Sequence, residues 1–141
     1  MLLAIPLLLI PVVLYNIVVL FGAPSGAGMV QADVLLRDPL FSITMTSGAQ
    51  WTIGSGDLIL FLGLILLFFE LLKSTSSQRI AIINHALSTI LFIGVLVEFL
   101  LLPGFATSTF FLIVIMILLD VLAGFIVTII ASRKDFDFGG A

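Results

Sequence analysis

Residues 109–131, TFFLIVIMILLDVLAGFIVTIIA, decide the fold of this chain, because Asp120 is the only charged residue among them. A helix needs about 20 consecutive apolar residues to cross a bilayer hydrocarbon core of about 30 Å. Thr107 or Ser108 can cap the start of such a helix, and two basic residues follow its end. The stretch therefore predicts a transmembrane helix that carries a carboxyl group near its middle.

The composition of the whole chain agrees with this stretch. Its 141 residues are 62% hydrophobic and 9% charged, with a mean hydropathy of +1.41, whereas soluble domains carry about 25% charged residues. A soluble domain of this length could not bury so much apolar surface, so we expect lipid to surround most of it. The five basic residues form no stripe for nucleic acid. The absence of cysteine excludes disulfides and thiolate metal sites.

Three further apolar segments complete a four-helix prediction: 2–21, 58–73 and 80–102. Lipid-exposed backbone must satisfy its own hydrogen bonds, so each segment is expected to be helical. The first contains Pro6 and Pro11, and we expect Pro11 to kink it. It could instead be a cleaved signal peptide, but no Lys or Arg precedes its apolar run, so we expect it to be retained. The sequence thus predicts one all-α membrane domain, residues 1–141, with four transmembrane helices that include 109–131.

The basic residues set the expected orientation. Four of the five flank the link between the second and third helices or follow the fourth helix, and only Arg37 lies in the long loop 22–56. Because cytoplasmic loops carry the excess of Lys and Arg, we expect loop 22–56 outside and both termini in the cytoplasm. The cytoplasmic tail 132–141 is expected to be a frayed end, with a short docking motif as the alternative.

The external loop contains a predicted β-hairpin at 41–53, between the first and second helices. Apolar residues alternate there with Ser, Thr and Gln on either side of a Gly-containing turn. An isolated hairpin is marginal in water, so its apolar face needs cover. We expect either a lid packed on its own bundle or a docking surface for a partner chain. The candidate docking residues are Phe41, Ile43, Met45 and Trp51.

Polar side chains within the apolar segments are costly in a membrane and are therefore candidate functional residues. Glu70 can form an i,i+3 ion pair with Lys73 near a helix end. His85 and Glu98 belong to a polar stripe on the third segment that we expect to pack inside the bundle. A lone histidine without a second His or a Cys completes no metal site, so no metal or other cofactor is expected.

Asp120 is the most interesting of these candidate functional residues. Its carboxylate needs a partner or water, or else it stays protonated. Candidate partners are Asn16 of the first segment, a hydroxyl group, or a residue of another subunit. Gly124, one turn further on, would let another backbone approach closely. Asp120 is interpreted as a buried, hydrogen-bonded group, as a proton- or ion-coupled group, or as a contact with a partner protein.

The stretch from Trp51 to Lys73, with Gly56 and Asp57 at the helix entry and FFELLK at its end (68–73), resembles small uncharacterised inner-membrane proteins of bacteria. The resemblance covers only the hairpin and the second helix. It implies an integral membrane location, expected to be the bacterial inner membrane, and no activity.

Two classes of function follow, neither of them enzymatic. The chain has no phosphate-binding Gly-Lys-Ser loop, no His-Glu-x-x-His and no Gly-x-Ser-x-Gly. The first class is an accessory or assembly subunit of a larger membrane complex, with protein partners or self-association in the lipid bilayer. The second is an oligomeric proton- or ion-coupled small transporter or channel that uses Asp120, with Glu98 and His85 along the path.

Overall fold

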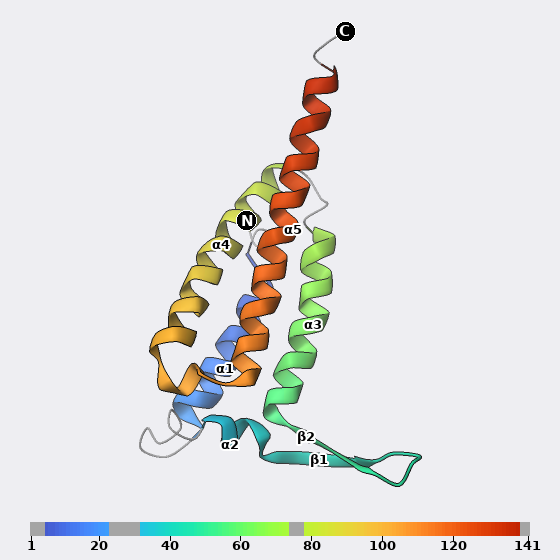
Figure 1. Cartoon of the computed structure of the whole chain (residues 1–141), viewed down its shortest axis with the longest axis vertical. Coiled ribbons are helices and arrows are strands. Elements are labelled where there is room, and N and C mark those ends of the chain that lie inside the picture. Colours follow the sequence, from blue (N-terminus) through green and yellow to red (C-terminus); the bar gives the residue numbers. More distant parts are fainter. Residues whose placement is uncertain (1–4, 23–31, 74–77, 139–141) are drawn as a thin grey trace.

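The computed structural model describes residues 5–22, 32–73 and 78–138 of the chain. These residues form a mostly helical structure with one small hairpin (Figure 1). In chain order the elements are α1 (Leu9–Phe21), α2 (Ala32–Arg37), β1 (Pro39–Thr44), β2 (Gln50–Gly54), α3 (Ser55–Lys73), α4 (Gln78–Leu101), the 3₁₀ turn η3 (Pro103–Phe105) and α5 (Ser108–Phe138).

Three of the helices are long and apolar enough to cross a membrane. The apolar stretches cover 19 residues of α3, 20 residues of α4 from Ile82 to Leu101 and 23 residues of α5 from Ser108 to Ile130. About 20 residues suffice to cross the hydrocarbon core. The prediction of a mostly helical chain is therefore confirmed, and three of its helices are compatible with an integral membrane protein.

The first apolar segment differs from the prediction, because its helix is short. α1 has 13 residues and begins at Leu9, so it is about 20 Å long at 1.5 Å per residue. Pro11 consequently lies in the first helical turn, where a backbone N–H would have no intrahelical partner. The expected kink at Pro11 is therefore wrong: the proline belongs to the start of the helix and not to its interior.

The four main helices run alongside one another, and the hairpin projects from one end of the bundle (Figure 1). We call this the hairpin end; the opposite end, where α3 finishes at Lys73, is the Lys73 end. α2 crosses the hairpin end beneath α1 and α3. α5 continues to Phe138, so residues 132–138 extend the helix where a frayed tail is expected from the sequence.

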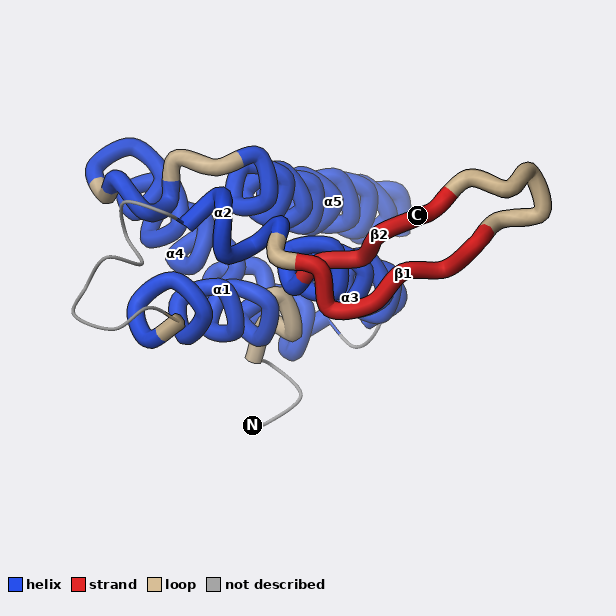
Figure 2. Tube along the Cα trace, turned by 90° about the horizontal axis from the view of Figure 1, so that it is seen from below, coloured by secondary structure: helices blue, strands red, loops and turns tan. Residues whose placement is uncertain are grey.

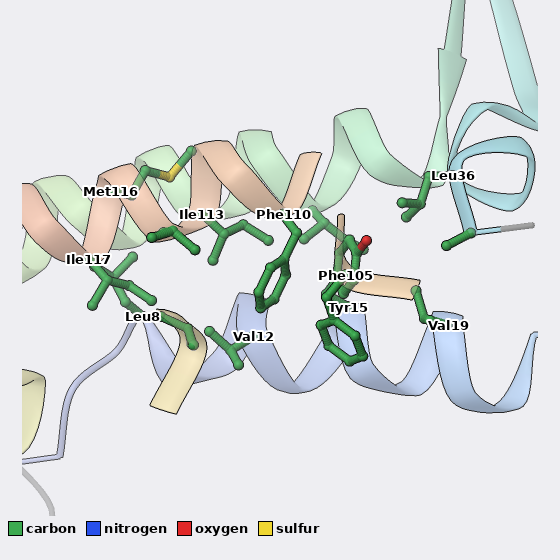
Figure 3. Packing of buried hydrophobic residues seen from close by; sticks show 14 of the residues in the cluster. Leu8, Val12, Tyr15, Val19, Leu36, Phe105, Phe110, Ile113, Met116 and Ile117 are labelled. Carbon is green, nitrogen blue, oxygen red and sulfur yellow. The ribbon is translucent and has the colours of Figure 1, made fainter. Parts of the chain in front are cut away.

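The apolar core lies mainly between α1 and α5 and follows α1 from Leu8 to Val19 (Figure 3). Tyr15 is fully buried there between the rings of Phe105 and Phe110, with centroid separations of 5.4 and 4.6 Å. Its hydroxyl donates to the Gly104 carbonyl at 2.9 Å and lies 2.6 Å from Thr107 Oγ1. Thr107 Oγ1 also accepts the amide of Phe110 at 3.1 Å, which confirms Thr107 as the cap of α5.

The hairpin forms where the alternation predicts it. β1 and β2 are antiparallel, with Ile43 opposite Trp51 and Phe41 opposite Ile53. Gly48 in the connecting turn has a φ of 82°, which favours glycine. Both strands extend away from the helices (Figures 1 and 2). The expectation of a lid packed on its own bundle is therefore wrong for these strands, because only the last two residues of β2 are buried.

Candidate functional site

A group of polar side chains lies inside the bundle, from the Lys73 end to the middle of α5. Three adjacent helices supply it, although each of these helices is otherwise strongly apolar. We call it the polar cluster, and its members are Glu70 and Lys73 of α3, Asn84, His85 and Ser88 of α4, and Asp120 of α5.

Glu70 is the best-satisfied member of the polar cluster, although it is fully buried. Its Oε2 accepts the backbone amide of Leu7 at 2.7 Å, and its Oε1 accepts the amide group of Asn84 at 2.6 Å. Lys73 Nζ lies 3.3 Å from the same Oε1, as the sequence predicts, and donates to the carbonyl of Ile5 at 2.7 Å. Glu70 thus connects α3 and α4 to the segment that precedes α1.

Asp120 lies at the other end of the polar cluster and has only 3% of its surface exposed. The hydroxyl of Ser88, also fully buried, faces its carboxyl group from α4. Their geometry nevertheless falls short of a hydrogen bond, and both Asp120 Oδ2 and Ser88 Oγ lack a partner among the described residues. The expected hydroxyl partner of Asp120 is therefore present in Ser88, but the two side chains form no hydrogen bond.

His85 occupies the space next to Gly124, one turn beyond Asp120 along α5. A Cβ on Gly124 would lie 2.3 Å from His85 Nδ1, so only glycine leaves room for the imidazole. The imidazole also meets the ring of Phe125 edge-on, with centroids 4.4 Å apart. Gly124 therefore permits close approach, as the sequence suggests, but the group that approaches is a side chain of α4.

Four buried polar atoms of the polar cluster have no hydrogen-bond partner within the described part of the chain. They are Asn84 Oδ1, His85 Nδ1, Ser88 Oγ and Asp120 Oδ2. Leaving such an atom unsatisfied costs about 1–3 kcal/mol, and buried polar groups are normally paired. The concentration of all four on facing parts of α4 and α5 identifies this interface as a place where a further polar species would be stabilised.

Asn16 and Glu98 lie apart from the polar cluster. They line an apolar groove of about 440 Å³ between α1 and α4. Asn16 Nδ2 donates to its own helix at Val12 O, 3.0 Å away, and reaches Glu98 Oε2 at 3.5 Å. Asn16 is therefore not the partner of Asp120, because its side chain points from α1 toward Glu98 of α4.

The second candidate site is the apolar side of the hairpin, which we call the hairpin face. Its four residues each expose about half of their surface: Phe41 48%, Ile43 44%, Met45 45% and Trp51 53%. Pairing of Ser42 with Thr52 and of Thr44 with Gln50 places the polar residues on the opposite side, where Gln50 Nε2 donates to Thr44 Oγ1 at 2.8 Å. The predicted separation into two faces is confirmed.

Some contacts of the polar cluster could not be predicted from the sequence. The amide of Leu7 carries no sequence signal, because its role depends on a bend before α1. Asn84 and Ser88 stand four residues apart on the predicted polar stripe, so their common face was recognisable while their partners were not. The described residues contain no group of three His, Cys, Asp or Glu side chains that could hold a metal ion.

The fold and the composition are those of a helical protein compatible with integration in a membrane, with a buried polar cluster and an exposed apolar hairpin face. No family model, curated protein or solved structure matches this chain. Its function must therefore be inferred from these two sites alone.

Proposed function

We propose that this protein is a non-catalytic accessory or assembly subunit of a larger membrane complex and that it contacts its partner through the hairpin face. In this proposal α1 joins α3, α4 and α5 as a fourth membrane-embedded helix, with the segment at Ile5–Leu8 completing its crossing. Both termini are cytoplasmic, the hairpin is external, and the membrane is the bacterial inner membrane. The basic residues at the Lys73 end support this orientation.

The observation that carries the proposal is the exposure of the hairpin face. The strands contribute little to the core of their own bundle, yet they retain Phe41, Ile43, Met45 and Trp51 on one side. Fully burying a large apolar side chain is worth about 1.5–3 kcal/mol. A half-exposed side chain therefore retains about half of that gain for an interaction with another surface, and neighbouring side chains add to it.

The backbone of the hairpin offers a second means of contact. The sheet has two strands, so each strand has an outer edge without a neighbouring strand among the described residues. Such edges accept an added strand from another protein, and side-chain pockets beside the strand then give specificity. The hairpin lies across the direction of the helices (Figure 1), which would bring it within reach of a neighbour beside this protein in the same membrane.

Purification in mild detergent tests the proposal. The wild-type chain should co-purify with a membrane protein at fixed stoichiometry, and the double variant Ile43→Ser/Trp51→Ser should lose that protein while keeping its helical content. The matched control is Ser42→Ala/Thr52→Ala on the polar side of the same strands, which should retain the partner. Isolation of the wild-type chain as a single monomeric species would refute the proposal.

The second function expected from the sequence, a proton- or ion-coupled transporter or channel, is favoured by the unpaired atoms around Asp120. Its expected path is divided in the structure, however. Asp120 and His85 belong to the polar cluster, whereas Glu98 pairs with Asn16 in the groove between α1 and α4. The subunit function is therefore the better supported of the two.

A further inference from the structure

The polar cluster contains two carboxyl groups, and only one of them belongs to an ion pair among the described residues. Glu70 and Lys73 form an ion pair at 3.3 Å, and the side chains of the two are 0% and 13% exposed. Asp120 adds a second carboxyl group, and no other described basic side chain acts on it besides Lys73 and His85. Because Lys73 is paired with Glu70, an ionised Asp120 has no ion-pair partner among the described residues.

The unpaired atoms of the polar cluster are mostly oxygen acceptors. Asp120 Oδ2, Ser88 Oγ and Asn84 Oδ1 are each buried without a hydrogen-bond partner, and their side chains are 3%, 0% and 3% exposed. Carboxylate, hydroxyl and amide oxygens are the ligands that hard cations prefer. One proton on Asp120 could satisfy Asp120 and Ser88 together, but it would leave Asn84 Oδ1 without a donor.

We propose that the polar cluster binds one Na⁺ ion, with oxygen ligands from Asp120 on α5 and from Ser88 and Asn84 on α4. A single positive charge matches the single uncompensated carboxylate. A divalent ion fits poorly, because the described residues include no group of three acidic or imidazole side chains that could hold a metal ion. The near-complete burial of the three ligands favours a small ion over K⁺ or an organic cation.

This site is independent of the proposed subunit function, because it lies within the bundle and shares no residue with the hairpin face. Its consequence is a link between α4 and α5 that depends on Na⁺. Bound Na⁺ would stabilise the folded state by mass action, since the unfolded chain does not bring the three ligands together.

Thermal unfolding of the purified full chain in detergent tests the proposal. The probes are NaCl, KCl and choline chloride at equal ionic strength and constant pH. NaCl should raise Tm in a saturable way, by about 5–10 °C at a hundredfold excess over Kd, whereas KCl and choline chloride should not. Asp120→Asn should abolish the Na⁺ effect, and Ser88→Ala should raise the apparent Kd about tenfold. Glu98→Gln is the matched control, because it alters a membrane carboxyl group outside the polar cluster.

The pH dependence separates Na⁺ from a proton. Glu70 and Lys73 face Asp120 from α3, and His85 faces it from α4. Acid should weaken Na⁺ binding, because protonation of Asp120 removes the charged ligand. A Tm that changes with pH but is identical in NaCl and choline chloride would overturn the proposal. An equal Na⁺ effect in wild type and Ser88→Ala would also overturn it, even if Asp120→Asn failed to fold.

Discussion

Replacement of Gly124 by alanine tests the packing of the polar cluster most simply. The added Cβ would lie 2.3 Å from His85 Nδ1 and 2.9 Å from His85 Cγ, closer than real Cβ contacts. The imidazole has little room to withdraw, because the ring of Phe125 lies edge-on with a centroid separation of 4.4 Å. We therefore expect α4 and α5 to separate slightly or His85 to leave its rotamer.

The size of the effect follows from two opposing contributions. Overpacking of a well-packed interface costs about 1–3 kcal/mol, whereas Gly→Ala within a helix gains about 1 kcal/mol from propensity. Gly94→Ala is a matched control, because a Cβ on Gly94 meets no atom within 4 Å and shows the propensity gain alone. The difference in unfolding free energy between Gly124→Ala and Gly94→Ala should thus be about 1–3 kcal/mol, the overpacking cost.

Reversible unfolding in mixed micelles with increasing denaturing detergent, followed by far-UV circular dichroism, measures this difference. Gly124→Ala should unfold at a lower detergent fraction than wild type, and Gly94→Ala at an equal or higher fraction. The addition of His85→Ala to Gly124→Ala should recover part of the loss, since it removes the group that the new Cβ strikes. A Gly124→Ala protein as stable as Gly94→Ala would refute the contact between His85 and Gly124.

Three further predictions concern the links that position these sites. Tyr15→Phe should lower the unfolding free energy by about 1–2 kcal/mol, because interhelical hydrogen bonds in membranes are worth about 0.6 and up to 1.7 kcal/mol each. Detergent titration measures this loss. The control Thr107→Ser keeps the hydroxyl and should show little change. Glu70→Leu should destabilise the protein by about 1–3 kcal/mol for each buried donor left without an acceptor, chiefly the amide group of Asn84, and hydrogen exchange should show loss of protection at the Leu7 amide. Gly48→Val should cost about 1–2 kcal/mol of local strain at a φ of 82°, seen as fraying of the hairpin in cross-strand NMR contacts without a change in the helices.

The sequence predicts those features that depend on local pattern. Alternation at 41–53 specifies the hairpin and its two faces, and Thr107 is recognisable as a cap because its hydroxyl can reach an amide within its own first turn. The pairing of Glu70 with Lys73 follows from their spacing on one helix. These features need no knowledge of how distant elements pack.

The features that the sequence analysis missed depend on how distant segments meet. Both Pro6 and Pro11 interrupt the first apolar run, and hydropathy alone does not show that the helix begins between them. Asn16 could be paired in sequence with either Glu98 or Asp120, and only the direction in which α1 faces decides for Glu98. The projection of the hairpin was unpredictable in the same way, because an amphipathic hairpin can cover its own bundle or present its face elsewhere.

Site-specific photocrosslinking in native membranes tests the central claim, that the hairpin face contacts a partner, most directly. A photoreactive phenylalanine analogue at Trp51, which is 53% exposed on the hairpin face, should give one discrete crosslinked protein species. The same analogue at Thr52, the next residue along β2 and on the opposite side, should not. Equal crosslinking from the two positions, or adducts with lipid alone from Trp51, would contradict the account.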